Sequence, residues 1–156
     1  MRIFITLLLL HMAFVSNAQE NLPSPEASFS AIIVTDMEVA ATWYQEVLGF
    51  QILNETRNME RGFQQKNLVH GSVHIELIEI KGTITPEALL TDHPKGSRVS
   101  GFFKFGVKVS GFDAWLVRLE TKKADIHGRV VTDPVSEKRM VIVKDPDGNR
   151  IQLFEK

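Results

Sequence analysis

Apolar residues at helical spacing mark the clearest element of this chain. Five of them follow the i, i+3, i+4, i+7, i+8 pattern of one helix face: Ala40, Trp43, Tyr44, Val47 and Leu48. Asp36 can accept hydrogen bonds from the free N–H groups that begin such a helix. Gly49 can adopt the left-handed conformation that ends one. The pattern predicts an amphipathic helix over residues 37–48.

The segments on either side of this helix have the alternating composition of strands. One strand is predicted before the helix, over residues 28–34. Three strands are predicted after it: 50–57, 63–69 and 73–80. Residues 58–62 and the pair His70-Gly71 supply the turns between these three strands. The first half of the chain is therefore expected to have the element order strand, helix, strand, strand, strand.

The second half repeats this order after a segment of different character. Residues 82–100 contain Pro86 and Pro94 and are predicted to be a linker with a short helical turn at 87–90. The elements predicted beyond the linker are a strand over 102–109, a helix from Phe112 to about Lys123, and strands over 129–132, 139–143 and 150–154. An internal duplication is the simplest explanation, and it predicts an α+β fold made of two βαβββ modules.

The first 18 residues have the features of a secretory signal peptide. Arg2 precedes an apolar run, and Ser16-Asn17-Ala18 offers small residues before a cleavage site. The run is shorter than the roughly 20 residues that a membrane-spanning helix needs. We therefore expect cleavage after Ala18, a flexible leader over 19–27, export to the periplasm or medium, and no integral membrane segment in the mature chain.

Charge and cysteine content exclude several classes of function. The formal net charge is −1, and removal of residues 1–18 takes away Arg2 and changes it to −2. A chain with this balance has no basic surplus for nucleic acid or an anionic membrane, so neither is expected as a partner. There is no cysteine, which excludes thiol nucleophiles, thiolate metal sites and disulfides.

Two distant segments resemble the landmark segments of a known superfamily. These are Val34-Thr35-Asp36 with the helix end Tyr44-Gln45-Glu46-Val47-Leu48-Gly49-Phe50, and the run Asp145-Pro146-Asp147-Gly148-Asn149-Arg150-Ile151-Gln152-Leu153. They resemble the vicinal oxygen chelate (VOC) proteins, the superfamily of glyoxalases, bleomycin resistance proteins and extradiol dioxygenases. The resemblance implies paired βαβββ modules that form a curved mixed sheet or half-barrel funnel with helices outside. It places one domain at 28–155, with module one at 28–81 and module two at 101–155.

The resemblance also indicates where relatives hold a divalent metal. Counted from the two motifs, the four ligand positions carry Phe29, Glu76, Lys104 and Gln152. One carboxylate, one amide, a phenyl ring and an ammonium group make a poor site for a divalent cation. We therefore predict no metal and no other cofactor. In their place we expect an ion pair between Lys104 and Glu76, with Gln152 completing the hydrogen bonds.

A rearranged metal site is the main alternative. His74 is expected to share a strand face with Glu76, because residues two apart on a strand point the same way. His74, Glu76 and Gln152 could then hold Zn²⁺, Mn²⁺, Fe²⁺ or Ni²⁺. The plainer interpretation makes His70 and His74 ordinary residues of the rim or surface.

Individual residues keep more than one interpretation. Lys104 can anchor an anionic ligand, pair with Glu76 as a structural partner, or act as an amine base with a lowered pKa. Glu76 is the best candidate for a catalytic residue, as a general base. The turn Asp145-Pro146-Asp147-Gly148 resembles a Ca²⁺ loop only superficially and is assigned no chemistry.

The resemblance and the strand alternation together predict an apolar pocket. Six residues are expected to contact the ligand: Phe29, Glu76, Phe102, Lys104, Gln152 and Phe154. A mostly apolar cavity with a few polar groups is typical of small-molecule sites, although large side chains could instead fill the space. We expect an exported protein that binds a small organic molecule without a metal, as a homodimer like many bleomycin-resistance relatives. The alternatives are a metal-dependent lyase, isomerase or dioxygenase, and a non-catalytic scaffold.

Overall fold

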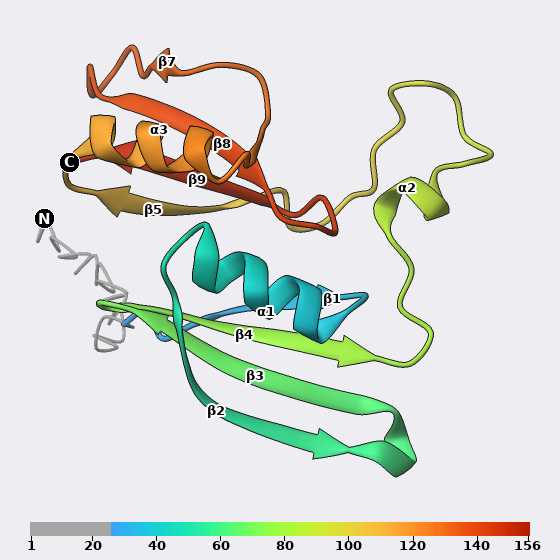
Figure 1. The fold of residues 1–156 in the computed structure, drawn as a ribbon. Coiled ribbons are helices and arrows are strands. Elements are labelled where there is room, and N and C mark those ends of the chain that lie inside the picture. The colour runs from blue at the N-terminus through green and yellow to red at the C-terminus, as the bar shows by residue number, and fades with distance from the viewer. Residues whose placement is uncertain (1–25) are drawn as a thin grey trace, which may run out of the picture.

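Two βαβββ modules joined by a linker make up the computed structural model, which describes residues 26–156 (Figure 1). Module one contains β1 (Ser30–Val34), α1 (Met37–Glu46), β2 (Gln51–Asn58), the 3-10 turn η1 (Met59–Arg61), β3 (Phe63–His70) and β4 (Val73–Ile80). The linker carries α2 (Pro86–Leu89). Module two contains β5 (Phe105–Val109), α3 (Phe112–Thr121), β6 (Asp125–Ile126), β7 (Val131–Thr132), β8 (Arg139–Lys144) and β9 (Arg150–Glu155). The predicted α+β class is confirmed, and module two repeats the element order of module one with one additional short strand.

The predicted signal peptide and most of the predicted leader lie outside the described residues, so both stay predictions. Within residues 26–156, no helix combines the length and apolar character that crossing a membrane requires.

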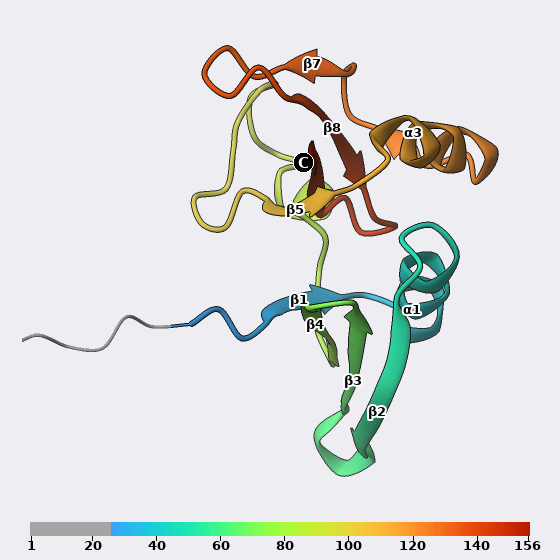
Figure 2. The same ribbon diagram turned by 90° about the vertical axis from the view of Figure 1, so that its left-hand side faces the viewer.

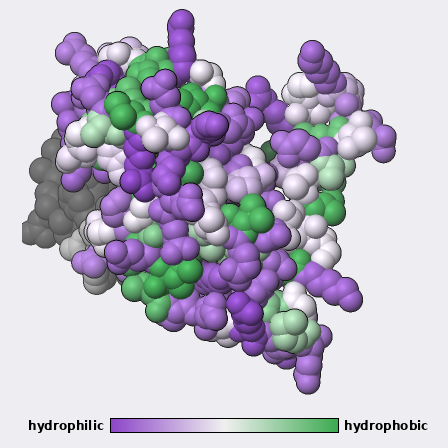
Figure 3. Space-filling model, viewed as in Figure 1, coloured by the Kyte–Doolittle hydropathy of each residue, from purple (hydrophilic) through white to green (hydrophobic). Residues whose placement is uncertain are grey.

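On the side seen in Figure 1, apolar residues gather in separate patches divided by hydrophilic ones (Figure 3).

Both sheets place their first strand beside their last. In sheet one the order is β1-β4-β3-β2, with β1 parallel to β4 and the other neighbours antiparallel. In sheet two it is β5-β9-β8-β6, with β5 parallel to β9, and β7 also pairs with β8. The prediction of a single strand over 129–132 is therefore wrong in detail. Two short strands, β6 and β7, pair with β8 instead. The predicted strand 102–109 begins only at Phe105.

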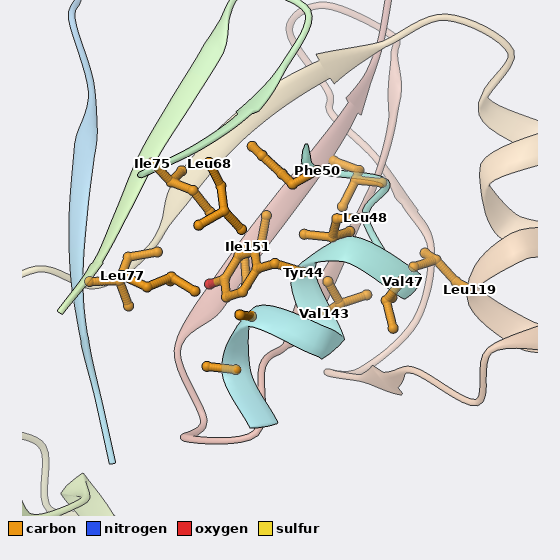
Figure 4. Packing of buried hydrophobic residues seen from close by; sticks show 14 of the residues in the cluster. Tyr44, Val47, Leu48, Phe50, Leu68, Ile75, Leu77, Leu119, Val143 and Ile151 are labelled. Carbon is orange, nitrogen blue, oxygen red and sulfur yellow. The ribbon is translucent and has the colours of Figure 1, made fainter. Parts of the chain in front are cut away.

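The helices α1 and α3 lie on the same side of the two sheets, which leaves the other side of sheet one open (Figure 2). Side chains from α1, from the turn after it and from both sheets form one apolar core, in which Tyr44 of α1 and Leu48 of the turn lie beside Val143 and Ile151 of module two (Figure 4). Trp43 and Trp115 lie partly buried at the edge of this core. The helix face predicted from periodicity is thus the face that joins the modules.

The helix ends follow the local sequence. Asp36 caps α1 by accepting a hydrogen bond from Val39 N at 3.0 Å, as predicted. Gly49 has a φ of +73°, the left-handed conformation expected after the helix. In module two the equivalent cap is Gly111, which has a φ of +66° and no side chain to accept a hydrogen bond.

The Asp145-Pro146-Asp147-Gly148 turn connects the two modules. The Tyr44 hydroxyl donates to Asp145 Oδ2 at 3.1 Å. Thr35 N donates to both carboxylate oxygens of Asp147 at 3.2 Å, and the Thr35 hydroxyl bonds the same carboxylate. The two segments that carry the superfamily resemblance are therefore in contact with each other, and this turn has a structural role that the sequence did not reveal.

Burial raises the pKa values of the two side chains in this contact, Tyr44 and Asp145. Desolvation, together with the charge of Asp145, raises the pKa of the Tyr44 phenol well above its usual value. Desolvation also raises the pKa of Asp145, although hydrogen bonds from Asn149 and Tyr44 oppose the change. The contact is thus most stable when the phenol keeps its proton.

A partly exposed ion cluster holds the outer elements of module two together. Arg139 of β8 donates to Glu155 of β9 at 2.7 Å and to Asp113 of α3 at 2.7 Å. The hydrogen bonds from Arg139 lower the pKa of Glu155 to about 2. This cluster lies within one module, unlike the buried contact between Tyr44 and Asp145.

Candidate functional site

The open face of sheet one carries the strongest candidate residue, Glu76. Along β4, Ile75 and Leu77 are buried in the core with α1. His74, Glu76 and Ile78 alternate with them and lie on the open face, where His74 is exposed and the other two are half-buried. The prediction that His74 and Glu76 share a face is confirmed.

Glu76 lies in a row that crosses the whole sheet. The strand registers pair it with Ala31 of β1 on one side and with Asn67 of β3 on the other. Asn67 in turn pairs with Asn54 of β2. Directly paired residues on one sheet face are within contact distance. The row Ala31, Glu76, Asn67, Asn54 therefore brings a carboxylate and two amides together.

Hydrogen bonds between amides order this face. Gln65 Nε2 donates to Asn67 Oδ1 at 2.9 Å, and Asn67 Nδ2 donates to Asn54 Oδ1 at 2.6 Å. The chain of amides ends with the carbonyl oxygen of Gln65 and the NH₂ group of Asn54. A ligand on this face would meet acceptors and donors that are already oriented.

Apolar side chains border the amide chain. Phe29 precedes β1 and is 57% exposed, while Ile33 on the same face of β1 is 54% exposed. Ala31 between them leaves space beside Glu76. Large apolar groups at the edge and polar groups in the centre form the combination that small-molecule sites use.

Module two places different chemistry at the equivalent position. The registers pair Gln152 with Gly106 of β5 and with Ile142 of β8. Gln152 is only 2% exposed, and its Nε2 is bonded to the Met140 sulfur. A Cβ added at Gly106 would lie 3.7 Å from the Phe154 ring. Gln152 and Phe154, two apart on β9, lie on the same face of the strand, but Gln152 is covered.

Phe102 and Lys104 lie in the linker instead of in a strand. Phe102 is 85% exposed, and the Lys104 ammonium lies 5.8 Å from the Phe103 ring centroid. In residues 26–156, no ion pair within 4.0 Å joins Lys104 to Glu76. The predicted pair is therefore wrong. The physical reason is that Lys104 lies before β5 and outside the sheets, while the strand register gives Glu76 the neighbours Ala31 and Asn67.

The donor set does not fit the four-ligand metal site of metal-using relatives. Phe29 and Lys104 offer no ligand to a cation, and the Gln152 amide is buried against Met140. In the described part of the chain, no group of three or more His, Asp or Glu side chains converges. Only His74 and Glu76 remain as neighbouring donors, which is fewer than the alternative of His74, Glu76 and Gln152 requires.

Sequence reasoning missed Gln65, Asn67 and Asn54. Gln65 and Asn67 lie two apart on the strand that precedes β4, and this spacing is the signal that could have found them. The short turn at Gly71-Ser72 pairs His70 with Val73, and counting back along both strands pairs Asn67 with Glu76.

Comparison with known proteins agrees with this architecture. The sequence pattern of the Glyoxalase/Bleomycin resistance protein/Dioxygenase superfamily matches residues 27–153. The chain is 32% identical to the protein YwkD of Bacillus subtilis (strain 168) and 29% identical to YaeR of Escherichia coli (strain K12). Each match extends over 126 residues and covers 80% of this chain and 92% of the relative.

Solved structures show the same fold. The glyoxalase family protein from Enterococcus faecalis superposes with a TM-score of 0.70 at 22% identity, covering 83% of this chain and 97% of that chain. The trypanothione-dependent glyoxalase I of Leishmania major superposes with a TM-score of 0.63 at 20% identity, covering 85% and 87%. With its two βαβββ modules and a sequence match over nearly all of the described residues, this chain belongs to the Glyoxalase/Bleomycin resistance protein/Dioxygenase superfamily.

Proposed function

We propose that this chain is an exported protein that binds a small organic molecule on the open face of sheet one, without a divalent metal. Its superfamily supports small-molecule binding in general. The apolar run and small residues of positions 1–18 support export.

One observation carries the proposal: the row Ala31, Glu76, Asn67, Asn54 is open, polar and ordered. The amide bond of 2.6 Å between Asn67 and Asn54 holds the polar groups in place. Preorganised polar groups lower the cost of binding because fewer side chains lose freedom when the ligand arrives. The exposed ring of Phe29 offers an apolar contact at the same face.

We propose binding without a metal because of the side chains that occupy the ligand positions. Glu76 and His74 supply two donors on one strand, Phe29 and Lys104 offer no ligand to a cation, and Gln152 is buried against Met140. Hydrogen bonds from the amides and the Glu76 carboxylate would then orient the ligand. A homodimer stays an expectation from the superfamily.

A ligand screen with matched variants tests the binding site. Thermal-shift measurements with planar aromatics, small carboxylates and small amines should identify compounds that raise the melting temperature. We expect Asn67→Leu to lower the affinity for these compounds by about tenfold, because it interrupts the amide chain. Gln45→Leu is the control, since Gln45 is an exposed amide on α1. If no compound binds, the scaffold alternative is favoured; compounds that bind Asn67→Leu unchanged would place the site elsewhere.

Metal analysis tests the second part of the proposal. Protein purified without chelator should carry no stoichiometric Mn, Fe, Ni or Zn, and EDTA should leave ligand affinity unchanged. Stoichiometric metal that is lost in Glu76→Gln, together with ligand binding that EDTA abolishes, would support a metal-dependent lyase, isomerase or dioxygenase instead.

A further inference from the structure

The Lys and Arg side chains of sheet one all lie on one of its faces. The strands β1–β4 contain two of them, Lys66 of β3 and Arg57 of β2. Both are on the side of α1, where Lys66 Nζ lies 2.6 Å and Arg57 Nη2 lies 3.3 Å from the carboxylate of Glu38. The open face of sheet one (Figure 2) therefore receives no ammonium or guanidinium group from the four strands that form it.

The same strands carry three carboxylates, and two of these have partners on the α1 side. Glu79 Oε2 accepts hydrogen bonds from Met37 N at 2.6 Å and from Gln64 Nε2 at 2.8 Å. Glu55 lies 3.5 Å and 3.9 Å from the two cations of the sheet. The third carboxylate, Glu76, is on the open face and forms no ion pair within 4.0 Å in residues 26–156. Sheet one thus has one carboxylate whose charge no cation of the described chain compensates.

The position of Glu76 makes this missing partner costly. Glu76 is half-buried, and a carboxylate that loses part of its water is stabilised by a cation or by hydrogen-bond donors. The amide nitrogen of Asn67 beside it donates to Asn54 instead. The sequence predicted Lys104 as the cation, but Lys104 lies before β5 and outside the sheets. A ligand can therefore supply the positive charge that the protein does not.

The residues around Glu76 suit an ammonium group attached to an apolar body. Phe29 and Ile33 lie two residues before and two residues after Ala31, the β1 partner of Glu76, and both are more than half exposed. Such diagonal positions are within reach of aromatic and long side chains. The face of an aromatic ring attracts a cation. The carbonyl oxygen of Gln65 adds a hydrogen-bond acceptor, because the amide nitrogen of this residue already donates within the amide chain.

We propose that the ligand of this face is a small organic cation whose primary ammonium group binds the carboxylate of Glu76. This inference rests on the function proposed above and adds the charge of the ligand to it. The ammonium group would donate to Glu76 and to the carbonyl oxygen of Gln65, and an attached ring would pack against Phe29 and Ile33. The charge of this ligand is opposite to the charge that an anchoring Lys104 would select.

Calorimetric titration with two probes of similar shape tests the charge of the ligand. Benzylamine carries the ammonium group, and benzyl alcohol is its neutral counterpart. Both are titrated at pH 8, where imidazole groups carry no charge, with EDTA present so that no trace metal takes part. We expect benzylamine to bind about tenfold more tightly than benzyl alcohol, and Glu76→Gln to remove this difference. Glu76→Asp keeps the charge and should weaken benzylamine less than Glu76→Gln does.

Glu120→Gln is the matched control for the loss of one negative charge. Glu120 is exposed on α3 and forms no ion pair within 4.0 Å in the described residues. This variant should bind benzylamine as the wild type does. Circular dichroism and the melting temperature confirm that each variant is folded.

Two results would overturn the inference about charge. One is equal affinity of the wild type for the two probes, and the other is benzylamine binding that Glu76→Gln leaves unchanged. If neutral compounds or carboxylates bind and lose affinity in Asn67→Leu, the open face is still a ligand site and only its preference for cations is wrong. If no compound depends on Asn67, the function proposed for this face is overturned as well.

Discussion

Module one and module two share a frame but differ in the chemistry at its centre. In both, the first strand runs parallel to the last, a helix covers one face, and the central residue of the last strand is paired with a small residue. In module one that central residue is Glu76, which is half-buried beside Asn67. In module two it is Gln152, which is 2% exposed beside Ile142. The duplication thus preserves the backbone, while only module one presents an open polar row for a ligand.

The largest expected effect concerns the contact that joins the two modules. Asp145 accepts hydrogen bonds from the Tyr44 hydroxyl, Asp147 N, Asn149 N and Asn149 Nδ2, at 2.8–3.1 Å. Asp145→Ala would leave these donors without a partner, and two of them, the Tyr44 hydroxyl and Asp147 N, are buried. We expect the free energy of unfolding to fall by about 3 kcal/mol. Urea denaturation followed by circular dichroism measures this change.

A matched carboxylate within one module provides the control. Asp133 also accepts two backbone hydrogen bonds, from Val135 N and Ser136 N, but these are exposed. Asp133→Ala should cost about 1 kcal/mol or less. Equal losses for the two variants would mean that the contact between modules contributes no more than an ordinary surface turn.

A reciprocal exchange tests the contrast between Glu76 and Gln152. Gln152→Glu would place a carboxylate in a buried position, and we expect a loss of about 2 kcal/mol at pH 7. Glu76→Gln should change stability by no more than about 0.5 kcal/mol, because Glu76 lies on an open face. Denaturation curves of both variants at pH 7 measure the difference.

Two further measurements test whether the buried charge causes the loss of stability in Gln152→Glu. The cost of Gln152→Glu should shrink at pH 4, where the new carboxyl can take up a proton. Gln45→Glu on the exposed surface of α1 shows the effect of the charge alone. A large cost for Glu76→Gln, or none for Gln152→Glu, would contradict the description of one open and one closed module.

A smaller effect than those of Asp145→Ala and Gln152→Glu is expected at neutral pH for Tyr44, which is the only tyrosine. Tyr44→Phe removes one hydrogen bond to Asp145 and should cost about 1 kcal/mol at pH 7. Because burial raises its pKa in the folded state, the unfolded chain loses the phenol proton first as pH rises above 10. The folded state then binds more protons, so stability falls with increasing pH.

Alkaline denaturation of both proteins checks this sign. The stability difference between the wild type and Tyr44→Phe should shrink and then reverse as pH rises above 10. The absorbance of tyrosinate reports Tyr44 alone, and in the folded protein it should increase only at a pH above that of the unfolded chain. Titration of the folded protein at the ordinary pH of a free tyrosine would contradict the buried contact.

Much of the local structure follows from residues close together in the chain. The helix periodicity of Ala40 to Leu48, the cap at Asp36 and the turn at Gly49 were all predictable because they depend on spacing within a few residues. The pairing of Asn67 with Glu76 also follows from a local turn, since the hairpin at Gly71 sets the register of β3 and β4. The amide row could therefore have been found from the sequence.

The wrong prediction for Lys104 shows that spacing along the chain does not predict the pairing of distant strands. Counting from a motif assigned Lys104 to a strand, but β5 begins one residue later, and each of its residues pairs with a residue of β9 that lies 46 positions further along the chain. No local turn sets the register of two parallel strands so far apart. The neighbours of Glu76 and Gln152 across the parallel pairs were therefore beyond prediction from spacing alone.

By itself, the sequence determined the two βαβββ modules, the helix faces and the hairpin registers, because each depends on periodicity or on a nearby turn. Only the tertiary structure decided that the Asp145-Pro146-Asp147-Gly148 turn bonds Tyr44 and Thr35, more than 100 residues away. It also decided that Glu76 stays open while Gln152 is covered. These outcomes depend on how two separately formed modules pack together, and packing between distant segments leaves no local pattern in the chain.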